Sequence, residues 1–368
     1  MHNVESLHVF QHRGGLRRTL HRLQERSLIV GFLGGSITDA RPGHNWPEPV
    51  MSWFVERFPD VRFFIENAAI GATGSDLAVF RAERDIIKRD CDLVFVEYAV
   101  NDAAPSETTK RSREGLLRKL LAGEGRDVVL VYTFNQPMYA YMSNGQMPPS
   151  IVEMEELGKH YNLPSVWMSL HAFRDVMAGR MRWEEWLPDG LHPESRGSLS
   201  YAQSVISFLE QELLTAPGGE AMLIGETRPE PLTIRNWEHA TTLPFAAVTL
   251  QGPWSIRRWP HVVWIDQVLA TAAIGARLSF SFTGHGLVLS FDFGKTSAEF
   301  RYRLDEGEWQ TVARERPAWC TTNGWFRPEL LADDLLDGEH TCELVVIHGD
   351  RPECTGTNFN LAFIGILQ

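Results

Sequence analysis

The chain has 368 residues, 43% of them hydrophobic and 22% charged, which is ordinary for a globular protein and long enough for two domains. Its formal net charge of -12 argues against nucleic acid as the main partner, because phosphate contacts require a basic surface. No apolar stretch reaches the length of a membrane span, and no basic segment followed by an apolar core lies near Met1. We therefore expect no membrane span and a cytoplasmic location.

From residue 26 to residue 214, short apolar runs alternate with amphipathic helical patterns. The runs are mostly continuous, which is typical of strands covered on both faces. We expect strands over 28–33, 61–66, 93–98, 128–134 and 165–170. We expect helices over 47–58, 75–89, 108–121, 151–161 and 195–214, with Ser75 as an N-cap. This alternation predicts a parallel sheet with helices on both faces.

The pattern changes after a linker at residues 215–220, where helical spacing stops. Period-two alternation then appears over 277–282 and 287–293, on either side of Gly284-His285-Gly286, which is a hairpin signal. Turn signals follow at 305–307 and 337–338, and 359–367 is a good closing strand. We predict two domains, an α/β domain over residues 1–215 and an all-β sandwich over residues 216–368.

The four cysteines are Cys91, Cys320, Cys342 and Cys354, and none belongs to a C-x-x-C pair. This spacing disfavours zinc, and we expect neither a metal nor a cofactor. A disulfide among the last three cysteines stays an open alternative.

Polar residues follow three successive strands of the predicted sheet. Ser36 follows the first strand, Gly71 the second and Asn101 the third, so all three belong at the edge where the carboxyl ends of the strands meet. Asp189 and His192 form an Asp-x-x-His pair further on. Each fragment alone is compatible with an ordinary turn or helix cap. Together, however, the residues supply the chemical roles that acyl transfer requires.

The chemistry assigns each residue a task. The Ser36 hydroxyl would attack an ester carbonyl, His192 would accept and return its proton, and Asp189 would orient the imidazole. The Asn101 side chain and the backbone amides of Ser36 and Gly71 would stabilise the oxyanion, each donor contributing roughly 2.7–4 kcal/mol.

These blocks resemble the SGNH (GDSL-type) hydrolases over about the first 214 residues, with Ser36, Gly71, Asn101 and His192 as the four marker residues. Asp189 matches the acid three positions before the histidine. The resemblance implies a flavodoxin-like three-layer fold and a metal-independent esterase, deacetylase, lipase or acyltransferase. Two departures are visible, because the usual Gly-Asp-Ser is Gly34-Gly35-Ser36 and the usual glycine before Asn-Asp is replaced by Ala99.

We therefore expect a serine esterase that removes a short acyl group, such as acetyl, from a carbohydrate or related small ester. One alternative is an acyltransferase with the same triad, and another is a non-catalytic carbohydrate-binding protein. Aromatic faces suit sugar rings, so Trp46, Trp183 and Trp186 are candidates for the pocket, and residues 135–150 are a candidate lid or pocket wall. We expect the sandwich to be a structural or substrate-shaping module, and the oligomeric state is not determined by the sequence.

Overall fold

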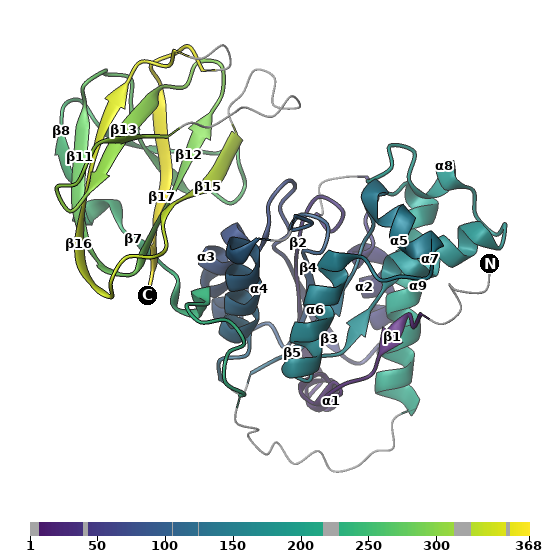
Figure 1. The fold of residues 1–368 in the computed structure, drawn as a ribbon. Helices are drawn as coiled ribbons and strands as arrows, with labels where there is room; N and C mark the ends of the chain where they lie inside the picture. The colour runs from purple at the N-terminus through teal and green to yellow at the C-terminus, as the bar shows by residue number, and fades with distance from the viewer. Residues whose placement is uncertain are drawn as a thin grey trace. The chain divides into compact units, whose positions relative to one another are not determined.

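The computed structural model describes residues 7–39, 43–104, 106–123, 125–215, 228–312, 325–350 and 354–368. The chain divides into two compact units, Met1–Glu238 and His239–Gln368 (Figure 1).

The first unit is built on a six-stranded sheet. Its strands are β1 (Phe10–Gln11), β2 (Ser27–Gly34), β3 (Arg62–Asn67), β4 (Leu93–Glu97), β5 (Asp127–Val131) and β6 (Ser165–Val166). Their order is β1-β6-β5-β4-β2-β3, and every pair is parallel except the short β1–β6 pair. The central strands β2, β4 and β5 are mostly buried, as expected for strands covered on both faces, and β4 is buried along its whole length. The edge strand β3 differs from that expectation, because Phe64 is 48% and Ile65 53% exposed.

The helices of this unit cover both faces of the sheet (Figure 1). They are α1 (Arg17–Gln24), α2 (Pro47–Arg57), α3 (Ser75–Asp85), α4 (Glu107–Leu120), α5 (Tyr139–Ser143), α6 (Pro149–His160), α7 (Met168–Met177), α8 (Trp183–Trp186) and α9 (Ser195–Glu210). Helices α3, α4 and α6 pack together, and α2, α7 and α8 pack around α9. The chain turns in opposite directions on the two sides of β2, so β2 is a topological switch point, where α/β sheets bind ligands.

Two local predictions for the first unit differ in kind from the structure. The predicted strand at 165–170 ends at Val166, and Met168 begins helix α7, because a short buried apolar run does not distinguish a strand from a buried helix. The second error is the N-cap of α3, where Gly74 takes the place expected for Ser75. The Ser75 hydroxyl instead shares a 2.7 Å hydrogen bond with Ser112.

The last segment of the first unit packs on helix α4. Glu114 accepts hydrogen bonds of 2.6 Å from the backbone amides of both Leu232 and Thr233, and Trp237 is buried nearby. A Cβ atom on Gly115 would lie 2.5 Å from the Trp237 backbone, so only a glycine lets the two backbones approach this closely. The contacts of this unit therefore continue to Glu238, past the linker predicted at 215–220, whose residues from 216 on lie outside the described residues.

The second unit is a sandwich of two antiparallel sheets. The first sheet has the order β15-β12-β17-β10-β9, with β7 also paired to β17, and the second has the order β14-β13-β16-β11-β8. The strands are β7 (Thr241–Leu243), β8 (Thr249–Gln251), β9 (Ser255–Arg258), β10 (Gln267–Thr271), β11 (Arg277–Gly284), β12 (Gly286–Phe293), β13 (Glu299–Leu304), β14 (Gln310–Thr311), β15 (Trp325–Ala332), β16 (Gly338–Ile347) and β17 (Phe359–Leu367). The flavodoxin-like α/β domain followed by an all-β sandwich is thus confirmed.

The predicted hairpin around Gly284-His285-Gly286 is wrong, because β11 and β12 lie in opposite sheets. Both strands turn their apolar side chains into the same core, including Phe280 of β11 and Leu289 of β12. Period-two alternation identifies the buried face of a strand, but it does not identify the neighbouring strand.

The described cysteines, Cys91, Cys342 and Cys354, form no disulfide with one another. Cys320, the remaining member of the possible disulfide, lies outside the described residues.

Candidate active site

Ser36 lies in the turn directly after the switch-point strand β2. The turn is closed by backbone hydrogen bonds from Thr38 and Asp39 to the carbonyl of Gly35. The Ser36 side chain is half-buried, whereas its neighbours are buried, so the hydroxyl is the reactive group that this turn presents at the sheet edge.

Ser36, His192 and Asp189 form a continuous hydrogen-bonded relay. The Ser36 Oγ atom lies 2.8 Å from His192 Nε2, and His192 Nδ1 lies 2.7 Å from Asp189 Oδ2. Because a carboxylate can only accept, the proton of a neutral His192 belongs on Nδ1, and Nε2 accepts from the serine. The geometry that general-base activation of a serine requires is therefore present.

The loop between α8 and α9 holds Asp189 in place. Its Oδ1 atom accepts hydrogen bonds from the backbone amides of Leu191 (2.8 Å) and His192 (2.7 Å), and the turn between them uses Gly190 with φ +79°. Burial raises the pKa of Asp189, but the hydrogen bonds from His192 and the Leu191 amide outweigh burial and hold that pKa below its usual range. Asp189 therefore stays ionised beside the imidazole.

The structure also brings Gly71 and Asn101 to Ser36. A Cβ atom on Gly71 would lie 3.4 Å from Ser36 Cβ, and a Cβ atom on Gly35 would lie 1.9 Å from Asn101 Oδ1. The second contact gives a physical reason for Gly34-Gly35-Ser36, because any side chain at position 35 would displace Asn101. All five residues predicted for the site are thus within one small region.

The three predicted oxyanion donors differ in their present partners. Neither the Ser36 amide nor the Asn101 side-chain amide donates to another residue in the described part of the chain. The Gly71 amide donates to Asp39 Oδ2 over 3.2 Å. Asp39 was not among the predicted site residues, although the sequence shows this carboxylate three residues after the serine.

A second overlooked carboxylate, Glu97, lies beneath the serine turn at the end of β4. It is fully buried and accepts hydrogen bonds from Thr133 (2.6 Å), Thr38 (3.2 Å) and the Gly35 amide (3.4 Å). Burial raises its pKa to about 7. The sequence could have indicated this residue, because a glutamate in an otherwise apolar strand must be buried, and a buried carboxyl group requires hydrogen-bond partners.

The three tryptophans predicted for the pocket differ in burial. Trp46 and Trp186 are fully buried, and Trp46 donates to Thr38, so these two pack the interior. Trp183 is half-buried and packs edge-on against Phe134 and Tyr139. In the 135–150 segment, Gln136 lies next to Gly190, so this segment borders the loop that carries Asp189 and His192.

No helix in the described part of the chain combines the length and apolar character needed to cross a membrane. No cluster of three or more metal-ligating side chains occurs in those same residues.

The fold of this chain, a doubly wound sheet followed by a β-sandwich, is similar to that of a solved two-domain esterase. A two-domain esterase active on acetylated mannans, crystallised with mannopentaose, matches with a TM-score of 0.79 and 22% identity, over 96% of this chain and 95% of that chain. A second crystal structure of a two-domain esterase active on acetylated mannans matches equally well, with a TM-score of 0.79 and 22% identity over 96% of both chains.

An acetylxylan esterase from Geobacillus stearothermophilus is also similar, with a TM-score of 0.42 and 18% identity over 50% of this chain and 94% of that chain. No protein-family model and no curated protein matches the sequence. The likeness to the two-domain esterase extends over both units of the chain and shows a shared fold.

Proposed function

We propose that this protein is a serine esterase that removes a short acyl group, such as acetyl, from a carbohydrate or related small ester through an acyl-enzyme. The observation that carries the proposal is the relay from Ser36 Oγ through His192 to Asp189, with contacts of 2.8 and 2.7 Å. Two open amide donors beside the serine support acyl transfer over a purely structural role for the relay.

In the first step, Ser36 Oγ attacks the ester carbonyl carbon while His192 Nε2 takes the hydroxyl proton. The carbonyl oxygen becomes an oxyanion, which the Ser36 amide and the Asn101 side chain stabilise. When the intermediate collapses, the carbon–oxygen bond to the alcohol breaks, and His192 gives its proton to the departing oxygen. The acyl group is then attached to Ser36.

In the second step, water repeats the sequence. His192 accepts a proton from the water as it attacks the acyl-enzyme, and it returns the proton to Ser36 Oγ when the acid leaves. Asp189 stabilises the imidazolium in both steps. The Gly71 amide joins the oxyanion donors when it exchanges Asp39 for the substrate oxygen.

The substrate class is proposed from chemistry and from the structural likeness together. The similar two-domain esterase acts on acetylated mannans. In this chain, the exposed Tyr139 belongs to the 135–150 segment that borders the His192 loop, and the half-buried Trp183 packs against Tyr139. Such aromatic faces suit sugar rings. All residues assigned to the reaction belong to the first unit, so the sandwich is proposed as a structural or substrate-shaping module.

The test is Ser36→Ala in the full chain. We expect loss of p-nitrophenyl acetate hydrolysis and of acetate release from acetylated mannan, with unchanged thermal unfolding. Ser195→Ala, at an exposed serine that begins α9, is the matched control and should keep its activity. Undiminished turnover by Ser36→Ala, or failure of a fluorophosphonate to label Ser36, would contradict the proposal.

A further inference from the structure

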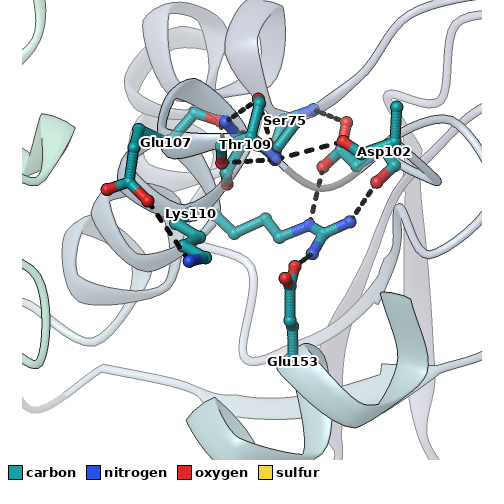
Figure 2. Close-up of polar contacts among 10 residues, drawn as sticks. Ser75, Asp102, Glu107, Thr109, Lys110 and Glu153 are labelled. Atoms are coloured by element: carbon teal, nitrogen blue, oxygen red, sulfur yellow. Dashed lines mark hydrogen bonds and ion pairs between the residues drawn. The ribbon is translucent and has the colours of Figure 1, made fainter. Parts of the chain in front are cut away.

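The loops that carry Gly71 and Asn101 meet at a buried carboxylate, Asp102. Figure 2 shows Asp102 beside Ser75, the first residue of α3, whose backbone amide donates to Asp102 Oδ1 over 3.2 Å. Gly74 is the last residue of the Gly71 loop, directly before Ser75, and a Cβ atom there would lie 2.3 Å from the same oxygen. The start of α3 and the turn after β4 are therefore in direct contact.

Arg113 of α4 binds both the side chain and the main chain of Asp102. Its Nε atom donates to Asp102 Oδ2 over 3.2 Å, and its Nη2 atom donates to the Asp102 carbonyl. The third nitrogen, Nη1, donates to Glu153 of α6 over 2.6 Å, which places Glu153 on the opposite side of the guanidinium (Figure 2). One side chain thereby joins α4, α6 and the residue that follows Asn101.

This contact is almost completely closed to solvent. The Arg113 side chain is 1% exposed and the Asp102 side chain 4%. Burial raises the pKa of the Asp102 carboxyl, and Arg113 opposes that shift by favouring the charged form. A planar guanidinium with several donors in fixed directions also fixes orientation, which a single ammonium group does not.

We propose that Arg113 is a positioning residue of the oxyanion hole, which acts through Asp102 to hold the Asn101 amide and the Gly71 loop at a fixed place beside Ser36. The inference rests on the proposed function. Its physical basis is that oxyanion donors act only when they lie about 2.7–3.1 Å from the oxygen, and a shift of about 1 Å can lower the rate about 100-fold.

The experiment compares Arg113→Lys with Arg118→Lys in the full chain. Lysine keeps the charge at position 113, but its one nitrogen cannot replace three guanidinium contacts. Arg118 is the matched control, because it is also buried in α4 and hydrogen-bonded to Glu238 and Tyr161, which take no part in the site. Both variants are compared at equal folded fraction, measured by thermal unfolding.

For Arg113→Lys we expect kcat for p-nitrophenyl acetate to fall about 10- to 100-fold, with KM within about twofold of the wild-type value. Affinity for a boronic acid, which forms a tetrahedral adduct on the serine, should fall in parallel with kcat. Arg118→Lys should keep both kcat and boronate affinity. Such a kcat-against-KM split is not expected of a residue that only stabilises the fold.

A wild-type kcat for folded Arg113→Lys, or equal losses in the two lysine variants, would overturn the inference. If Arg113→Lys does not fold, Glu153→Gln is the second variant, because it removes the ion pair behind Arg113 and keeps the contact with Asp102. It should lower kcat about 3- to 10-fold at constant KM, and an unchanged kcat would equally overturn the inference. Failure here leaves Ser36-dependent turnover intact, whereas failure of the proposed function shows in Ser36→Ala.

Discussion

The Asn101 side chain occupies the space beside the serine that a side chain at position 35 would fill, since a Cβ atom there would lie 1.9 Å from Asn101 Oδ1. At the residue scale, this contact links a departure from the family pattern to a proposed catalytic group. The sequence alone showed a missing carboxylate at position 35. The structure shows that the absence of a side chain there is what leaves room for Asn101.

We predict that Gly35→Ala lowers kcat by displacing Asn101, by about 100- to 1,000-fold, the usual effect of losing one oxyanion donor. Asn101→Ala should give a similar loss. Because both changes remove the same interaction, the double variant should be no worse than Asn101→Ala alone. Steady-state kinetics of the three variants checks this, and multiplicative losses would show that the two residues act independently.

Glu97 makes the free energy of unfolding depend on pH, in a direction that its raised pKa determines. Its pKa is raised from 4.5 to about 7 by burial, so between these pH values the unfolded chain loses the proton while the folded protein retains it. Stability therefore falls as pH rises through this window, by about 3 kcal/mol in total for a shift of this size.

We predict that Glu97→Gln removes this component. Urea unfolding of both proteins at pH 4.5 and pH 7.5 measures it, and the wild-type protein should lose more stability between the two pH values than the variant does. Parallel stability profiles for the two proteins would contradict the assignment.

At the scale of elements, the surroundings of a helix can reverse the effect of its intrinsic propensity. Gly115 lies inside α4, where alanine is normally more favourable than glycine by about 1 kcal/mol. In this protein a Cβ atom at position 115 would lie 2.5 Å from the Trp237 backbone. The close approach between α4 and the segment ending at Glu238 therefore decides whether replacing Gly115 by alanine stabilises or destabilises the protein.

We predict that Gly115→Ala destabilises the first unit by about 1–3 kcal/mol, the range typical of overpacking. Thermal unfolding checks the prediction, with Lys110→Ala, at an exposed position of the same helix, as the control. A stabilised Gly115→Ala variant would mean that residues 228–238 do not pack on α4 as described.

The predictions of helices and strands succeeded where the sequence pattern is compatible with a single structure. The buried strands 28–33 and 93–98 were found because continuous apolar runs bounded by loops suit the middle of a parallel sheet. They failed at residues 165–170 and at the β11–β12 hairpin, where the same burial pattern suits two structures. The choice depends on partners that are distant in sequence.

At the scale of the whole molecule, the boundary between the two units lies after a segment held by α4. Arg118 donates to the Pro229 carbonyl over 2.8 Å and to Glu238 over 2.7 Å, and Glu114 binds the amides of Leu232 and Thr233. Residues 228–238 therefore complete the surface of the first unit, although their sequence carries no regular pattern.

We predict that a chain shortened to residues 1–238 unfolds at a higher temperature than one shortened to 1–215, because the shorter chain exposes the surface that Trp237 covers. The 1–238 chain should also hydrolyse p-nitrophenyl acetate, since all the proposed catalytic residues lie within it. Calorimetry of the two chains is the measurement, and equal unfolding temperatures would argue against this boundary.

The sequence by itself determined the layers of both units, the order of the site blocks and the identity of Ser36, Gly71, Asn101, Asp189 and His192 as candidates. These follow from local periodicity and from the rule that parallel strands end at one edge, so neighbours along the chain carry the information. Only the tertiary structure decided that Gly35 makes room for Asn101, that Asp39 engages the Gly71 amide, and that Arg113 reaches Asp102. The physical reason is that these contacts depend on the packing of side chains from separate elements, at separations that no local pattern encodes.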